Sequence, residues 1–257
     1  MLEYIDLAII PVFLLILVRI TAFFVTMPLF SYRTVPNIFK IGISFFLALI
    51  VFTTMNFENI VLDNYIILLI KEAIIGLLIG LVAYIVISAV QIAGGFIDFQ
   101  MGFAIANVID PQTGAQSPLL GQYFYIIALL FLLSVNGHYL IIDGIYNSFQ
   151  FVAIDEYIPI EEGSIIKFVL FTFNKMFIIA FQIAIPIVGC LFLVDIALGM
   201  IARTVPQLNV FVVGLPIKIF VSFLVILLFL SLYIILIRTL FTTMFETIHS
   251  LMSLFGG

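Results

Sequence analysis

Apolar runs close to the length that crosses a bilayer recur along the whole sequence, which has 257 residues. About six such runs can be separated, among them 7–30, 66–93 and 210–237. A membrane-spanning helix needs ~20 mostly apolar residues, whereas the strands of a membrane barrel alternate over about ten. Because 65% of the residues are hydrophobic and only 9% are charged, the chain is far more apolar than a soluble domain. The sequence predicts an all-α, polytopic membrane protein with a single integral membrane domain over 1–257.

Two runs deviate from the usual span length. The run 41–55 is short, while the run 165–200 is longer than a bilayer at 1.5 Å rise per residue. We expect the long run to tilt, to break at Pro186, or to extend beyond the membrane. The last segment, 238–257, carries charges on one side and apolar residues at helical spacing, which indicates an amphipathic tail that is an interfacial helix or a partner contact.

The segment 94–118 interrupts this apolar material. It contains two carboxylates, Asp98 and Asp110, together with three glutamines and turn-forming proline and glycine. Irregular backbone cannot face lipid, because its N–H and C=O groups would remain unpaired. We therefore expect a re-entrant, irregular loop that lines a water-filled space or is buried in protein. We regard this loop as the best candidate for the functional segment of the protein.

The third run has one small and polar face. At 100° per residue this face occupies an arc of about 160°. Its members are Glu72, Gly76, Gly80, Ala83, Ser88, Gln91, Gly95 and Asp98. The pair Gly76 and Gly80 forms a small-xxx-small pattern that lets another helix approach closely. Two interpretations stay open and are compatible: a tight helix–helix contact, and a polar end of the face that borders an aqueous path.

Charged residues inside apolar runs are costly and face a partner or a cavity. For Arg19 and Asp195 we favour a structural ion pair, or contacts to neighbouring chains, over substrate handling. A proton relay through aspartates is the weaker alternative; its members would be Asp98, Asp110, Asp143 and Asp195. His138 and Asp143 have no nucleophile nearby in sequence, so we expect no enzyme activity.

The chain contains a single cysteine, Cys190, and its two histidines, His138 and His249, are far apart in sequence. Neither a disulfide nor a metal framework is indicated. We expect no cofactor and no metal.

These residues together resemble the FliR family, the membrane export-gate subunit of the bacterial flagellar type III secretion apparatus. The resemblance runs from Arg19 to about Lys218. Its elements, in order, are Arg19 with Pro28, Arg33-Thr34-Val35-Pro36, Lys71-Glu72 with Gly76 and Gly80, Ala93-Gly94 with Asp98, Gln100-Met101-Gly102, Asp110-Pro111-Gln112-Thr113-Gly114, Asn136-Gly137-His138, Ala184-Ile185-Pro186, Leu198-Gly199, Ala202-Arg203, Pro206-Gln207-Leu208-Asn209-Val210-Phe211 and Gly214-Leu215-Pro216. The injectisome homologues share the architecture, but the Asp110–Gly114 and Asn136–His138 elements resemble the flagellar branch more closely.

The resemblance implies a function and partners. Family members assemble with FliP-like and FliQ-like subunits, and with other export apparatus membrane proteins, into a gate of long helical hairpins. The gate lies in the bacterial inner membrane at the flagellar basal body, and unfolded flagellar proteins pass through it. No nucleic acid is implied. Because hairpins in such a gate are lifted partly out of the bilayer, the positive-inside rule is a weak guide to the orientation of the loops near Arg33 and Arg203.

The resemblance also implies a plug between the Gln-x-Gly and Asp-Pro elements, which here corresponds to 102–114. Ile105 and Val108 match positions where aromatic side chains occur in relatives, and Phe103 supplies bulk in their place. The plug and gate residues expected from this are Phe103, Ile105, Val108, Asp110, Pro111 and Gly114. An ordered re-entrant packing loop is the alternative for the same segment.

Two other function classes stay open. A secondary transporter would place a solute site in the broken segment, but it predicts an internal repeat that we do not find in this sequence. A purely structural scaffold subunit predicts that substitutions in the plug change neither export nor leakage.

Overall fold

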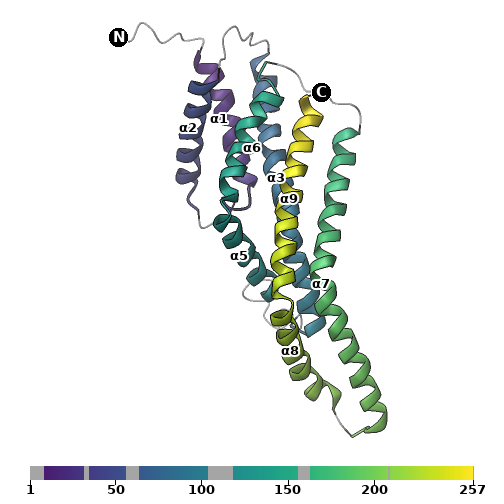
Figure 1. The fold of residues 1–257 in the computed structure, drawn as a ribbon. Coiled ribbons are helices and arrows are strands. Elements are labelled where there is room, and N and C mark those ends of the chain that lie inside the picture. Colours follow the sequence, from purple (N-terminus) through teal and green to yellow (C-terminus); the bar gives the residue numbers. More distant parts are fainter. Residues whose placement is uncertain are drawn as a thin grey trace. The chain divides into compact units, whose positions relative to one another are not determined.

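The computed structural model describes residues 9–31, 35–55, 64–103, 118–155, 163–207 and 209–256, and every regular element within them is a helix. In chain order the helices are α1 (Ile9–Thr26), α2 (Asn37–Thr54), α3 (Tyr65–Met101), α5 (Leu119–Ser134), α6 (Gly137–Phe151), α7 (Ser164–Thr204), α8 (Val210–Leu228) and α9 (Leu230–Gly256) (Figure 1). Among these, five are long and apolar enough to cross a bilayer, and the bent pair of α5 and α6 supplies a sixth candidate. The prediction of an all-α, polytopic membrane protein is confirmed.

The chain divides into two compact units. Unit 1 comprises Met1–Val86, Val135–Thr172 and Thr243–Gly257, and unit 2 comprises Ile87–Ser134 and Phe173–Thr242. The long helices α3, α7 and α9 each begin in one unit and end in the other. Each unit is therefore assembled from segments that are distant in the sequence.

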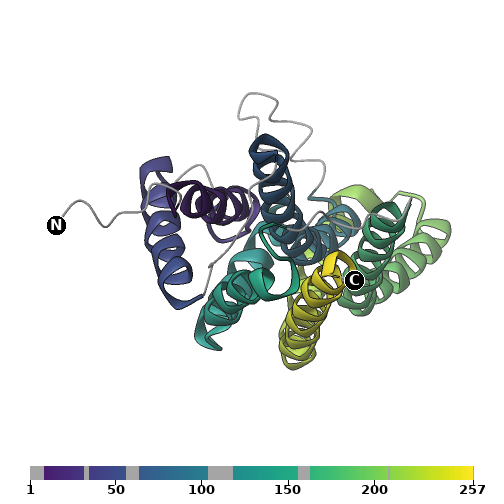
Figure 2. The same ribbon diagram turned by 90° about the horizontal axis from the view of Figure 1, so that it is seen from above.

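Unit 1 packs the start of α3 with α1, α2, α6 and the end of α9. Helices α1 and α2 lie side by side in both views (Figures 1 and 2). Phe13 of α1 meets Phe45 and Phe52 of α2 edge to face, at ring-centroid distances of 5.5 and 6.0 Å. Such geometry is favourable for aromatic rings. The two helices are thus joined by a specific aromatic contact rather than by small residues.

The C-terminal tail is the second half of α9, and its apolar face is buried within unit 1. The buried side chains are Met244, Ile248, Leu251, Met252 and Phe255. His249 packs edge to face on Phe151 at the end of α6. The amphipathic pattern of the tail therefore corresponds to packing inside the protein, and a free interfacial helix is not what this part of the chain forms.

Unit 2 contains the end of α3, α5, most of α7, all of α8 and the start of α9. Tyr233 of α9 donates a hydrogen bond from its hydroxyl to the carbonyl of Phe124 in α5 at 2.8 Å, and the two rings pack at 4.8 Å. Phe96 of α3 stacks on Phe181 of α7 at 5.0 Å. These contacts fix α3 to α7 and α5 to α9.

Three boundaries differ from those expected from the sequence. The third run stays helical through Gly94 to Met101, as its small face extending to Asp98 predicts, so 94–101 belongs to α3 and not to the irregular loop expected over 94–118. The overlong run forms α7 without a break at Pro186. The run 210–237 is divided between α8 and α9 at Phe229, where the sequence has neither glycine nor proline to signal an interruption.

Candidate functional site

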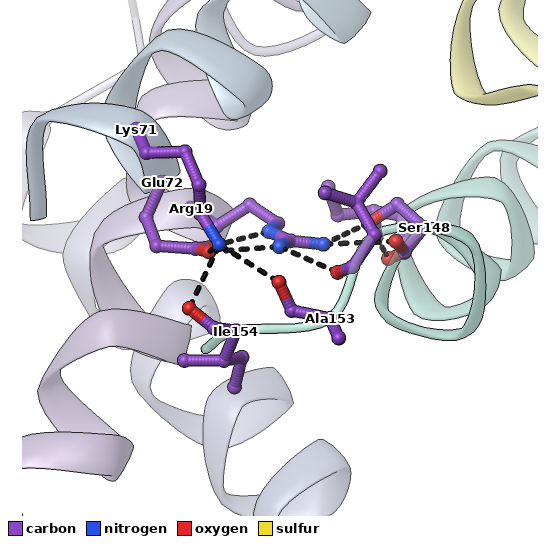
Figure 3. Close-up of polar contacts among 8 residues, drawn as sticks. Arg19, Lys71, Glu72, Ser148, Ala153 and Ile154 are labelled. Atoms are coloured by element: carbon purple, nitrogen blue, oxygen red, sulfur yellow. Dashed lines mark hydrogen bonds and ion pairs between the residues drawn. The ribbon is translucent and has the colours of Figure 1, made fainter. Parts of the chain in front are cut away.

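Three charged side chains meet inside unit 1, and we call them the Arg19 cluster: Arg19 of α1 with Lys71 and Glu72 of α3 (Figure 3). Arg19 Nη2 lies 2.9 Å from Glu72 Oε1, and its Nε contacts the other carboxylate oxygen, so the ion pair is bidentate. Lys71 Nζ lies 2.9 Å from Glu72 Oε1. The side chains of Arg19 and Glu72 are 0% exposed, so these charges depend on one another for their solvation.

Arg19 also binds the end of α6. Its Nη1 donates to the carbonyl of Ser148 at 2.9 Å and to the Ser148 hydroxyl at 3.2 Å, and its Nη2 donates to the carbonyl of Val152 at 3.0 Å. The guanidinium carbon lies 4.1 Å from the ring centroid of Phe149. The last carbonyls of a helix lack partners within the helix and carry partial negative charge. Arg19 therefore caps α6 from outside the helix.

Lys71 completes this cap. Its ammonium donates to the carbonyls of Ala153 at 2.7 Å and Ile154 at 2.8 Å, immediately after α6 (Figure 3). Together with Glu72 these two carbonyls give the three donors of Lys71 three acceptors. The Arg19 cluster is thus a saturated joint of α1, α3 and α6, which leaves no donor of Lys71 for a proton path or a ligand.

The two charges singled out from the sequence, Arg19 and Asp195, belong to different ion pairs. Arg19 pairs with Glu72 in unit 1, and Asp195 pairs with Lys218 of α8 in unit 2 at 2.5 Å. The pairing of Arg19 with Glu72 and of Asp195 with Lys218 cannot be seen in the sequence, because each of these two pairs joins two helices, whereas Lys71 pairs with Glu72, its neighbour in α3.

The small face of α3 packs on α1 through Gly76 and Gly80. A Cβ at Gly76 would lie 2.1 Å from the carbonyl oxygen of Arg19, and one at Gly80 would lie 2.0 Å from Thr26 Oγ1. Thr26 Oγ1 in turn donates to the carbonyl of Leu77 at 3.2 Å. The backbones of α1 and α3 are in direct contact here, as small residues permit.

The same face continues in unit 2 against α5. A Cβ at Gly94 would lie 2.1 Å from the Cα of Gly121, and one at Gly121 would lie 2.7 Å from the carbonyl oxygen of Gln91. Gly95 lies beside Pro118, whose Cγ is 3.5 Å from the Cβ position. Gly94 and Gly95 therefore lie where α3 and α5 cross, as a continuation of the small face predicts.

Asp98 caps the start of α5. Its Oδ2 accepts the N–H of Leu120 at 3.0 Å, and the side chain is only 2% exposed. The residue before α5 is Pro118, which has no side-chain acceptor, so a carboxylate from α3 supplies the cap that the sequence around α5 lacks. Asp98 Oδ1 has no hydrogen-bond partner among the residues that the structure describes.

Helix α3 ends at Gly102 in a Schellman motif. Phe103 N–H donates to the carbonyl of Asp98 at 2.9 Å, and Gly102 N–H donates to the carbonyl of Phe99 at 3.2 Å. Gly102 has φ +92°, a conformation that glycine adopts without strain. Phe103 is half-buried at the start of the predicted plug. The other predicted plug residues lie outside the described residues; they are Ile105, Val108, Asp110, Pro111 and Gly114.

The aspartates of the alternative proton relay have separate local partners. Asp143 of unit 1 accepts a hydrogen bond from Asn147 Nδ2 at 3.0 Å, whereas Asp98 and Asp195 belong to unit 2. His138 packs on the neighbouring ring of Tyr139 at 4.2 Å. Within the described ranges, no three His, Cys, Asp or Glu side chains form a group that could hold a metal ion.

Comparison with known proteins agrees with this architecture. Residues 10–244 match the model of the family "Bacterial export proteins, family 1". The chain is 55% identical over 249 residues to the flagellar biosynthetic protein FliR of Bacillus subtilis, covering 96% of both chains. It is 25% identical to FliR of Escherichia coli, covering 92% of this chain and 91% of that one.

A relative with a different name is Yop proteins translocation protein T of Yersinia pestis, which is 30% identical over 208 residues, covering 79% of this chain and 80% of the relative. The identity to the flagellar protein of Bacillus subtilis is much higher and extends over nearly the whole chain. With a family match that includes α3 and both of the ion-pair systems described above, the chain belongs to family 1 of the bacterial export proteins, as a member of the FliR family.

Proposed function

We propose that this protein is a subunit of the flagellar type III protein export gate in the bacterial inner membrane, at the flagellar basal body. It forms part of the channel through which unfolded flagellar proteins leave the cell interior, and it does not act as an enzyme. The names of its relatives support export rather than solute transport, and the 55% identity to a flagellar FliR supports the flagellar branch over the injectisome branch.

The observation that carries a gate function is the end of α3. The helix is held by buried contacts on α1 and α5 and stops sharply at Gly102, immediately before the segment with the bulky residues Phe103, Ile105 and Val108. A rigid support beside an apolar segment is what a hydrophobic constriction requires, because apolar side chains exclude water and ions from a narrow channel. In this proposal Asp110, Pro111 and Gly114 are further gate residues of the same segment.

Partners follow from the exposed apolar surface. Phe46 of α2 and Phe220 of α8 are each 69% exposed, and other large apolar side chains line the same helices. Faces of this kind require lipid or other membrane helices as their surroundings. We propose that FliP-like and FliQ-like gate subunits, and other export apparatus membrane proteins, cover part of them.

The decisive experiment removes the apolar segment. Deleting 105–108 in the full chain, expressed with its neighbouring export proteins, should raise ion leakage through the closed gate, because the constriction loses its bulk. Replacing Ile105 and Val108 by Leu and Ile is the matched control, since apolar bulk is kept. Leakage at the wild-type level in the deletion, with the protein present in the membrane, would show that this segment is not the plug.

Copurification separates the remaining alternatives. A stable complex with FliP-like and FliQ-like chains would support the gate assignment. Solute uptake by the chain alone in vesicles would instead support the secondary transporter. Unchanged export and leakage in every variant of the segment would leave only a scaffold role.

A further inference from the structure

The C-terminal end of α3 is fastened to α7 and α8 by one carboxylate. Gln100 Nε2 of α3 donates to Asp195 Oδ2 of α7 at 2.8 Å, and Lys218 Nζ of α8 lies 2.5 Å from Asp195 Oδ1. Asp195 therefore binds α3 through one carboxylate oxygen and α8 through the other. We call Gln100, Asp195 and Lys218 the α3 clamp.

Two close contacts of glycines with leucine side chains lie near the α3 clamp. Leu215 of α8 lies against Gly102, with its Cδ2 only 2.5 Å from the position of a Cβ. Gly214 of α8 lies against Leu198 of α7, whose Cδ1 would be 3.1 Å from a Cβ. The residue that ends α3 and the hairpin of α7 and α8 are thus in direct contact next to the α3 clamp.

A cavity that is open to the surroundings lies beside the α3 clamp. It is lined by Phe99, Leu198, Gly199, Val210, Phe211 and Leu215 in addition to clamp residues. On this side the last turn of α3 lacks the close packing of a protein interior, so its polar contacts contribute more to its position.

The charges of the α3 clamp are not deeply buried. The side chain of Asp195 is 36% exposed and that of Lys218 is 20% exposed. Both groups are partly exposed, whereas Arg19 and Glu72 are fully enclosed, so the α3 clamp is held less tightly by surrounding protein than the Arg19 cluster is. The two ion-pair systems therefore differ in burial: the Arg19 cluster is enclosed, and the α3 clamp is partly open.

We propose that the α3 clamp positions the last turn of α3, with Asp195 as the shared acceptor, so that Gln100 and Lys218 are positioning residues for the point at which the chain leaves α3. Any effect of the clamp on gating rests on the proposed export-gate function. That the clamp positions the end of α3 does not rest on that function, because this concerns only contacts within unit 2. When the clamp is intact, Gly102 stays against Leu215; when it opens, the end of α3 is free to move toward the cavity.

The test uses charge reversal in the full chain, expressed with its neighbouring export proteins. Asp195→Lys and Lys218→Asp each place like charges together and should open the clamp. The double reversal restores the ion pair, and Gln100 still fits because its amide can accept as well as donate. The reporter is Leu198→Cys in a Cys190→Ser background, since Leu198 lines the cavity and is only 6% exposed.

The labelling rate of the reporter by a small maleimide should rise about tenfold in either single reversal and return close to the unreversed rate in the double. Asp143→Lys is the control, because it makes the same change of charge on an exposed aspartate in unit 1. Equal labelling in all variants, or a double reversal as reactive as the singles, would overturn the clamp.

A milder variant covers the case in which the single reversals fail to accumulate. Gln100→Leu removes only the hydrogen bond from α3 and keeps the Asp195–Lys218 pair, so labelling should rise by a smaller factor; an unchanged rate would overturn the clamp. Ion leakage is measured in parallel. If the labelling rate rises in the variants that open the clamp but ion leakage stays constant, the clamp is supported. The proposed role of this helix end in gating would then be wrong.

Discussion

Arg19 and Glu72, 53 positions apart in the sequence, form a bidentate ion pair in which neither side chain is exposed. Glu72 also neutralises Lys71, so one carboxylate faces two cations. Losing one partner of a buried pair leaves an uncompensated charge, which costs far more than replacing the pair as a whole. The Arg19 cluster is therefore the place in unit 1 where a single substitution should do the most harm.

Replacing Glu72 by Gln should destabilise the protein by about 3–5 kcal/mol, because Arg19 and Lys71 lose their shared counter-ion in a site without water. The amount of protein in the membrane and its thermal unfolding midpoint in detergent would measure this. Glu246→Gln on the exposed face of α9 is the control and should change neither. A Glu72→Gln protein as abundant and as stable as wild type would refute this account of the cluster.

Gly76→Ala should separate α1 from α3 and cost about 1–3 kcal/mol, since the new Cβ would lie 2.1 Å from the carbonyl oxygen of Arg19. The matched control is Gly144→Ala in α6, where no atom lies within 4 Å of the Cβ position. That change should be neutral or stabilising by up to about 1 kcal/mol, because alanine favours a helix. Thermal unfolding of the two variants should thus shift in opposite directions; equal shifts would argue against the α1–α3 contact.

Asp98→Ala should weaken the start of α5 by about 1–2 kcal/mol, because the N–H of Leu120 loses its acceptor. Amide hydrogen exchange at Leu120 should become faster. Asp98→Asn keeps an oxygen acceptor and should retain most of the protection. If the alanine and asparagine variants exchange at the same rate, the capping role of Asp98 is wrong.

Gly102→Ala should disturb the end of α3 for two separate reasons. Its φ of +92° is strained for a residue with a Cβ, and that Cβ would lie 2.5 Å from Leu215 Cδ2. The clash with Leu215 can be removed by shortening that side chain. Gly102→Ala combined with Leu215→Ala should therefore recover part of the stability that Gly102→Ala alone loses. No recovery in thermal unfolding would show that Leu215 does not contact this position.

The membrane class of the protein and the small face of α3 could both be predicted from the sequence. Span-length apolar runs leave little choice of fold, because backbone in lipid must satisfy its own hydrogen bonds. The periodicity of Gly76, Gly80, Gln91, Gly95 and Asp98 marks a single helical face, and the structure places Gly76 and Gly80 against α1.

The partners across that face could not be predicted. The sequence places Gly95 on the continuing small face of the third run, but it does not identify the helix that packs there: Gly121 of α5 lies against Gly94, and Pro118 lies beside Gly95. Arg19 and Asp195 are conspicuous charges, but Glu72 and Lys218 as their partners depend on which helices meet. The contacts of Arg19 and Lys71 to carbonyls in the last turn of α6 and just after it cannot be recognised from side-chain types, because every residue carries a carbonyl group.

The sequence alone thus determined that this is a helical membrane protein and that its third apolar run has one small and polar face, since these depend on hydrophobicity and on the period of one helix. The tertiary structure decided where α3 ends, which charges neutralise one another, and that Asp98 caps a helix other than its own. Those features are contacts between segments far apart in the chain, and their free energy depends on geometry that no local pattern of residues contains.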